Sequence, residues 1–189
     1  MSTELDRLVE VMARLRAECP WTRQQTHESL RPYLLEEAYE TLEALDSGDP
    51  DHLREELGDL LMQVVIHAAV AEDFDIEDVA RGIADKLVHR NPHVFADGTA
   101  STPEEVDAAW QRLKAESKQR TSPLDGLPTN LPALLFADKV IGRTGAIAAE
   151  PISAEDLGEQ LFALVARARA SGLDPEHALR TTARTHAHP

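Results

Sequence analysis

The chain has 189 residues, with 34 acidic side chains against 19 basic ones, and its formal net charge is −15. That balance argues against a general binder of long nucleic acid, which needs a basic surface, and against electrostatic docking on anionic lipid. The single cysteine, Cys19, leaves no internal disulfide framework and no Cys-rich zinc site. The N-terminus shows no apolar leader, and no apolar run reaches membrane-spanning length, so we expect a cytoplasmic protein without a membrane partner.

Helical periodicity dominates the chain, and no alternating pattern of useful length predicts a strand. Alanine, leucine and glutamate are plentiful, while aromatic residues make up only 4%. We therefore expect an all-α fold, a helical bundle. The predicted helices begin near Leu5, at Pro32, at Pro50, after Asp75 and at Pro103, and further helical segments lie near residues 133–147, 154–170 and 175–186.

Turn residues mark where several of these helices begin and end. Cys19-Pro20-Trp21 breaks the first helix, because the residue before a proline avoids helical backbone. Ser47-Gly48 ends the second helix. Asp49 before Pro50 is typical of an N-cap followed by proline at the first helical position. Asn91-Pro92 stops the fourth helix.

Proline and glycine gather between Arg120 and Pro132, which predicts an irregular connector. We therefore expect a main unit over residues 1–119, a linker over 120–132 and a C-terminal segment over 133–189.

An internal similarity links the C-terminal segment to the main unit. Residues 155–162, EDLGEQLF, repeat the pattern of residues 55–62, EELGDLLM. Chance similarity between two amphipathic helices is the alternative. The match favours a shortened second copy of part of the main unit.

Acidic residues are concentrated from residue 36 to residue 59, where ten of them accompany a single basic residue. Glu37 and Glu40 lie at i, i+3 on the second predicted helix, so their carboxylates are neighbours. Glu56 and Asp59 repeat that spacing on the third helix. The loop between these helices is short, so we expect an antiparallel pair on which the four carboxylates can converge.

The four carboxylates border the apolar stripes of their helices. Packing like charges there is costly unless a cation compensates them. Oxygen-only ligands select a hard ion, Mg²⁺ or Mn²⁺. The alternative is a solvated acidic face whose charges merely favour helix N-termini. Two such pairs on consecutive helices favour the metal site.

Two basic residues and one aromatic residue are further candidates. Lys86 and Arg90 lie at i, i+4 on the fourth predicted helix, where they can hold phosphate oxygens. An ordinary pair of cations at a helix C-terminus is the alternative, and spacing alone leaves it ahead. Trp21 can stack on a base or anchor a core, and both interpretations stay open.

Four segments in order resemble the MazG nucleoside triphosphate pyrophosphohydrolases. Glu36-Glu37-Ala38-Tyr39-Glu40 followed by Glu56-Leu57-Gly58-Asp59 resembles the EExxE…ExxD signature of that family. Cys19-Pro20-Trp21-Thr22 with Gln25-Thr26-His27 resembles its CPWD…QTH segment. Asp85-Lys86-Leu87 and the stretch from Arg90 to Asp97 resemble its DK…RRHPHVFAD segment. The resemblance runs from about Leu5 to Lys118.

The resemblance implies an all-α NTP pyrophosphohydrolase that cleaves nucleoside triphosphates between the α and β phosphorus atoms and forms a homodimer. It implies Mg²⁺ as the bound ion, and from the carboxylate ligands we expect Mn²⁺ to be a substitute. Our hypothesis is an in-line attack on the α-phosphorus by a metal-bound water. The residues that it implicates are Glu37, Glu40, Glu56 and Asp59 as metal ligands, Glu36 in orienting the water, Asp85 near the metal, and Lys86 and Arg90 in binding the triphosphate. From the residues themselves we add Glu40 and Asp85 to the catalytic candidates and Trp21 to the substrate-binding candidates.

The C-terminal segment departs from the family pattern. No second EExxE helix precedes its ExxD-like pair, Asp156 and Glu159, and Arg184 falls where Asp85 would be. We therefore expect a degenerate, catalytically dead second MazG-like copy. A dUTP- or phosphoribosyl-ATP-directed relative and a non-catalytic helical regulatory module are the alternatives for the whole chain. The intact motif residues of the main unit argue against the second of these.

Overall fold

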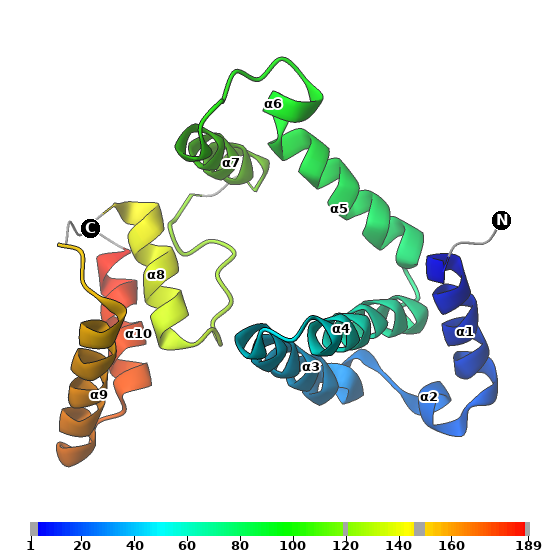
Figure 1. Ribbon diagram of the computed structural model, residues 1–189, viewed down its shortest axis with the longest axis horizontal. Helices are drawn as coiled ribbons and strands as arrows, with labels where there is room; N and C mark the ends of the chain where they lie inside the picture. Colours follow the sequence, from blue (N-terminus) through cyan, green and yellow to red (C-terminus); the bar gives the residue numbers. More distant parts are fainter. Residues whose placement is uncertain (1–3, 119–120, 146–149, 188–189) are drawn as a thin grey trace. The chain divides into compact units, whose positions relative to one another are not determined.

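The computed structural model describes residues 4–118, 121–145 and 150–187, and within these ranges it contains helices and no strand (Figure 1). The expected all-α fold is confirmed. Among the described residues, no helix combines the length and the apolar character that crossing a membrane requires. The helices are α1 (Glu4–Glu18), α2 (Pro20–Gln24), α3 (His27–Ser47), α4 (Pro50–Val70), α5 (Ile76–Arg90), α6 (Pro92–Phe95), α7 (Pro103–Ser117), α8 (Ala133–Thr144), α9 (Ala154–Ala170) and α10 (Pro175–His186).

The chain divides into two compact units, unit 1 (Met1–Ala109) and unit 2 (Trp110–Pro189), so the division falls inside α7. The assignment of a linker to residues 120–132 stays a prediction.

The start of α3 differs from the expectation. The helix begins at His27, and Pro32 lies inside it. Thr26 and Ser29 form a reciprocal cap, because the Thr26 hydroxyl accepts from the Ser29 backbone N–H and the Ser29 hydroxyl accepts from the Thr26 N–H. This cap satisfies two backbone donors and starts the helix before the proline. Pro32 then removes only one backbone donor near the start of a long helix, which the helix tolerates.

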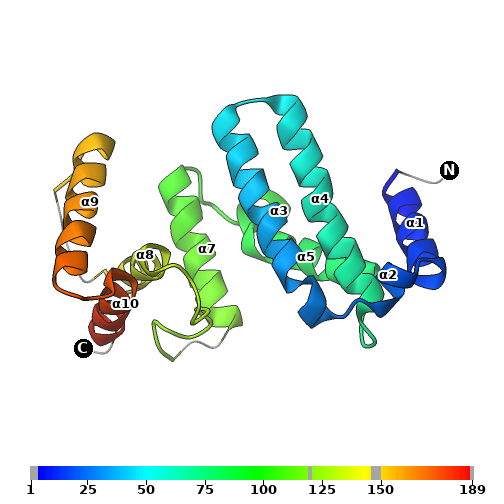
Figure 2. The ribbon, with the colours of Figure 1, turned by 90° about the horizontal axis from the view of Figure 1, so that it is seen from below.

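A tight connection joins α3 to α4, as the sequence predicted. Gly48 has a φ of 68°, the left-handed conformation in which glycine commonly ends helices. Asp49 then caps α4, because its Oδ1 accepts from the backbone N–H groups of Asp51 and His52. Figure 2 shows the resulting pair of antiparallel helices lying side by side.

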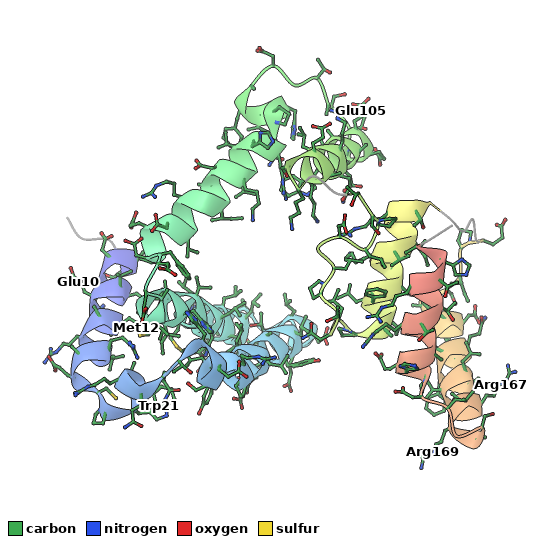
Figure 3. The ribbon with its side chains drawn as sticks, turned by 180° about the vertical axis from the view of Figure 1, so that it is seen from behind. Glu10, Met12, Trp21, Glu105, Arg167 and Arg169 are labelled. Carbon is green, nitrogen blue, oxygen red and sulfur yellow. The ribbon has the colours of Figure 1, made fainter. Side chains whose placement is uncertain are left out.

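The core of unit 1 lies where α1 and the first turns of α3 meet the second half of α4. Figure 3 shows Met12 on the side of α1 that faces α4. The half of the α3–α4 pair nearer its turn is less covered, with Leu42 and Leu57 54% and 50% exposed. The core residues are Met12, Leu30, Val65 and Ile66, with Leu8, Val9, Met62, Val70 and Ile76 packed against them.

Unit 2 is built around the pairing of α8 with α10 (Figure 1). Its buried residues come from these two helices and the residue that follows α10, and the connector before α8 packs leucines against them. Helix α9 contacts α10 but has no buried residue of its own. The core residues are Phe136, Val140, Ala183 and Ala187, with Leu124, Leu127, Leu131 and Ala137 packed against them.

Candidate active site

Three carboxylates converge between α3 and α4 in unit 1. One oxygen from each of Glu37, Glu56 and Asp59 lies within 4.8 Å of the others, and all three residues are partly buried. Glu56 and Asp59 share one face of α4 because they are three residues apart. The Gly48–Asp49 turn sets the register that brings this face opposite Glu37. This is the one such group among the residues that the structure describes.

Glu40, the fourth expected ligand, lies at the edge of this cluster. It is exposed and outside the group of three. It is still near enough for its negative charge to raise the pKa of Glu37. Its role as a ligand stays a prediction.

The cluster carries an electrostatic penalty. Desolvation raises the pKa of Glu37 above its usual value, and the charges of Asp59, Glu40 and Glu56 raise it further. Both effects disfavour the ionised carboxylate, and a bound cation reverses them. The cluster therefore has the electrostatics of a cation site.

An orphaned oxygen also fits a cation. Glu56 Oε1 lies 3.4 Å from His52 Nε2. Glu56 Oε2 is buried and has no hydrogen-bond partner among the described residues. Unpaired buried oxygens are costly, and a carboxylate oxygen is a ligand that hard divalent ions prefer. The residues present therefore fit a divalent cation such as Mg²⁺.

Gln63 is a site residue that the sequence analysis missed. It lies one turn after Asp59 on α4, is 2% exposed, and donates a side-chain hydrogen bond to the Glu37 carboxylate that partly offsets the rise in the pKa of Glu37. A polar residue at i+4 from a proposed ligand, inside an apolar run, was the signal that could have found it.

The expected catalytic residues outside the cluster are exposed. Glu36 precedes Glu37 on α3, and Asp85 lies on α5. Neither belongs to the group of three carboxylates. The described geometry leaves both accessible to a substrate.

The two basic candidates on α5 differ in exposure. Lys86 is exposed, whereas Arg90, the last residue of α5, is only 7% exposed. Lys86 is therefore the more accessible of the two to a phosphate group.

Trp21 on α2 is 51% exposed, so it does not anchor a core (Figure 3). Its ring meets that of Tyr33 edge to face, with centroids 5.8 Å apart. The exposed half of the Trp21 side chain stays accessible to a ligand.

A histidine pair lies at the other end of the α3–α4 helices. The Nδ1 atoms of His27 and His67 are 2.8 Å apart, and the rings are stacked. Phe74 stacks on His27 in turn. Burial, and then His27, lowers the pKa of His67. This pair is separate from the carboxylate cluster.

Comparison with known proteins identifies the family. The model of the MazG nucleotide pyrophosphohydrolase domain matches residues 25–95, which include every carboxylate of the cluster. The chain is 36% identical over 210 residues to the nucleoside triphosphate pyrophosphohydrolase/pyrophosphatase MazG of Thermotoga maritima, covering 95% of this chain and 81% of that one. It is 47% identical over 146 residues to the nucleoside triphosphate pyrophosphohydrolase of Escherichia coli K12, covering 72% of this chain and only 56% of that protein.

A solved structure agrees with the sequence relatives. The crystal structure of a mazG-related protein from Thermotoga maritima is 34% identical, superposes with a TM-score of 0.51, and covers 58% of this chain and 97% of that chain. The helical fold, the convergence of the motif carboxylates and these similarities agree, and the chain belongs to the MazG family of nucleotide pyrophosphohydrolases.

Proposed function

We propose that this chain hydrolyses nucleoside triphosphates to nucleoside monophosphate and pyrophosphate. The observation that carries the proposal is the cluster of Glu37, Glu56 and Asp59, whose orphaned oxygen and mutual repulsion call for a cation, inside the region that matches the MazG domain. We assign the activity to residues 1–119, with 120–132 as a connector and 133–189 as a shortened second copy without the full motif set.

Glu37, Glu56 and Asp59 would hold the cation, with Glu40 completing the set, and Mg²⁺ is the ion that we propose, with Mn²⁺ as a substitute. When bound, the ion supplies charge neutralisation for the phosphate oxygens and makes a water a better nucleophile. Gln63 keeps the Glu37 carboxylate directed into the cluster.

The remaining residues position the reactants. Glu36, exposed beside the cluster, orients the attacking water towards the α-phosphorus and accepts its proton, and Glu40 and Asp85 assist from the rim. Lys86 offsets the negative charge that develops on the departing pyrophosphate, as phosphoryl transfer requires. Arg90, at the end of α5, assists Lys86 in holding the phosphate groups. Trp21, which is half exposed, stacks on the base.

The test is incubation of the full chain with nucleoside triphosphates and Mg²⁺, followed by chromatography of the products. Monophosphate with pyrophosphate supports the proposal, whereas diphosphate with phosphate, or no turnover, contradicts it. The variant Glu40→Gln should lose most of the activity. Glu43→Gln is a matched control, because Glu43 is an exposed acid on the same helix outside the cluster. A panel of canonical, deoxy and oxidised nucleotides would define base and sugar preference.

We also propose a cytoplasmic homodimer that acts on free nucleotides and not on long nucleic acid. Exposed leucines along the less covered half of the α3–α4 pair support self-association, because apolar side chains there gain by leaving water. The net charge of −15 supports the exclusion of long nucleic acid.

A further inference from the structure

Four polar side chains form one stripe along α4. They are spaced by four, three and four residues, so at about 100° per residue they lie within about 60° of one another around the helix. Gln63, at one end of the stripe, is buried and bonds to Glu37, and the other three are partly buried. The proposed mechanism uses every member except the one at the opposite end, His52. The stripe consists of His52, Glu56, Asp59 and Gln63.

His52 contacts one of the two oxygens of Glu56. Its Nε2 lies 3.4 Å from Glu56 Oε1, whereas Glu56 Oε2 is buried and has no hydrogen-bond partner among the described residues. The Glu56 side chain is 13% exposed and that of His52 is 37% exposed, so the contact is partly shielded from water. Arg54, the other basic residue on this part of α4, is 78% exposed and pairs with Asp51 instead. Within the described part of the chain, His52 is therefore the basic side chain that meets the cluster.

The two oxygens of a carboxylate matter for the choice of ion. Ca²⁺ accepts six to eight oxygens and takes carboxylates through one oxygen or both, whereas Mg²⁺ requires a compact, nearly octahedral set. A donor on Oε1 of Glu56 leaves only Oε2 for an ion. His52 Nε2 can donate from the neutral ring and from the protonated ring, so this contact does not require a change of charge. A small rotation of either side chain brings the separation to the roughly 2.9 Å of a typical hydrogen bond.

We propose that His52 holds Glu56 with a single oxygen towards the cation and thereby makes the site select Mg²⁺ and Mn²⁺ against Ca²⁺. His52 acts through Glu56 and is a positioning residue, because it contacts a ligand and not the reacting atoms. Gln63 has the same relation to Glu37 at the other end of the stripe. The inference rests on the cation site of the proposed function, but not on the substrate or on the reaction.

Competition between two ions tests the selectivity. Electron paramagnetic resonance of free Mn²⁺ gives the Mn²⁺ affinity of the full chain, and displacement by Ca²⁺ gives the Ca²⁺ affinity. Binding that Asp59→Asn retains lies outside the cluster and is subtracted. His52→Ala should weaken Mn²⁺ binding about tenfold without weakening Ca²⁺ binding, so the preference for Mn²⁺ falls about tenfold. Equal changes for both ions, no change, or no Mn²⁺ binding by the parent chain overturns the proposal.

Two polar substitutions separate the contact from a general effect on the fold. The side-chain amide nitrogen of glutamine reaches about as far as His52 Nε2, whereas that of asparagine reaches only as far as Nδ1. His52→Gln should therefore keep the preference for Mn²⁺, and His52→Asn should lose it as His52→Ala does. The Asp49 cap is kept in all three variants, because it accepts from the backbone N–H of residue 52. Loss of the preference in His52→Gln, or its retention in His52→Asn, contradicts the proposal.

Arg54→Gln is the control for charge. It removes a positive charge from the same part of α4 without touching the stripe, so both affinities should shift in the same direction and the preference should stay. A loss of preference equal to that of His52→Ala would overturn the proposal. Product chromatography is read separately. Ion selectivity that depends on His52, without nucleotide hydrolysis, refutes the proposed function alone, and hydrolysis with selectivity independent of His52 refutes this inference alone.

Discussion

Helices α4 and α9 carry the same eight-residue pattern in different surroundings. In α4 the pair Glu56 and Asp59 faces Glu37 on α3 and is partly buried. In α9 the corresponding Asp156 and Glu159 are exposed, and Asp156 accepts from the Ser153 hydroxyl at the helix start. We infer from this difference that a pair of acids three residues apart forms a cation site here only where a neighbouring helix adds a third carboxylate and partly buries the group. The following experiments test this, from the largest expected effect to the smallest.

Removing the same group from each helix should have unequal consequences. Asp59→Asn removes one negative charge from the cluster and should lower pyrophosphohydrolase turnover about 100-fold or more. This loss is larger than the loss expected from changing a residue that only hydrogen-bonds to a metal ligand. Glu159→Gln, its counterpart on α9, should leave turnover unchanged. Steady-state rates at saturating Mg²⁺ measure both. Similar losses in the two variants would mean that α9 shares in the chemistry.

Gln63 and Ala163 occupy the same place in the two patterns, so exchanging them tests the supporting hydrogen bond. Gln63→Ala removes the donor to Glu37 and should weaken Mn²⁺ binding about tenfold, as loss of an outer-shell partner does. Ala163→Gln should leave binding unaltered. Electron paramagnetic resonance of free Mn²⁺ gives both affinities without reference to turnover. Equal binding by Gln63→Ala and the parent chain would remove Gln63 from the site.

Repulsion within the cluster should be visible in the metal-free protein. The pKa of Glu37 is raised in the folded state, so its ionised form destabilises the fold at neutral pH. Glu37→Gln should therefore raise the unfolding temperature in chelator by about 1–2 °C. The advantage should shrink as the pH falls towards 4.5, the ordinary pKa of a glutamate, because the parent Glu37 is then also protonated. Thermal unfolding scans across this pH range measure the difference in unfolding temperature between the two proteins. A difference that does not change with pH would contradict repulsion at Glu37 as its cause.

The histidine pair should produce the smallest effect. The pKa of His67 is lowered in the folded state, so the stability that neutral His67 contributes is present above its usual value of 6.5 and is lost as the pH falls through the folded value. His67→Gln should flatten this loss. His177→Gln, an exposed histidine on α10, is the control. Chemical denaturation at several pH values decides, and parallel curves for both variants would exclude the pair as the source.

Local signals predicted most of the helices because caps act over a few residues. Gly48 and Asp49 ended and began helices where expected. Pro32 was misplaced because the sequence reasoning weighed the preference of proline for a first turn and not the reciprocal cap of Thr26 and Ser29.

The site could be predicted only as far as the spacing of residues along a helix determines which side chains lie on the same face. Spacing predicted that Glu37, Glu56 and Asp59 converge, but it did not distinguish Glu40, which is exposed and lies outside the group of three. Gln63 was missed, because a sequence pattern does not reveal which polar atom lies across the interface between two helices.

The tight turn at Gly48 and Asp49 limits where residues can be inserted or deleted without separating the carboxylates of the cluster. Adding or removing one residue within α4 before Glu56 would rotate the later carboxylates by about 100°, away from Glu37. Insertions after Asp59 or before Glu37 would leave the three oxygens together. The number of residues from Glu37 to Asp59 is therefore fixed by the site. We expect relatives that keep the site to vary in length outside this interval and not within it.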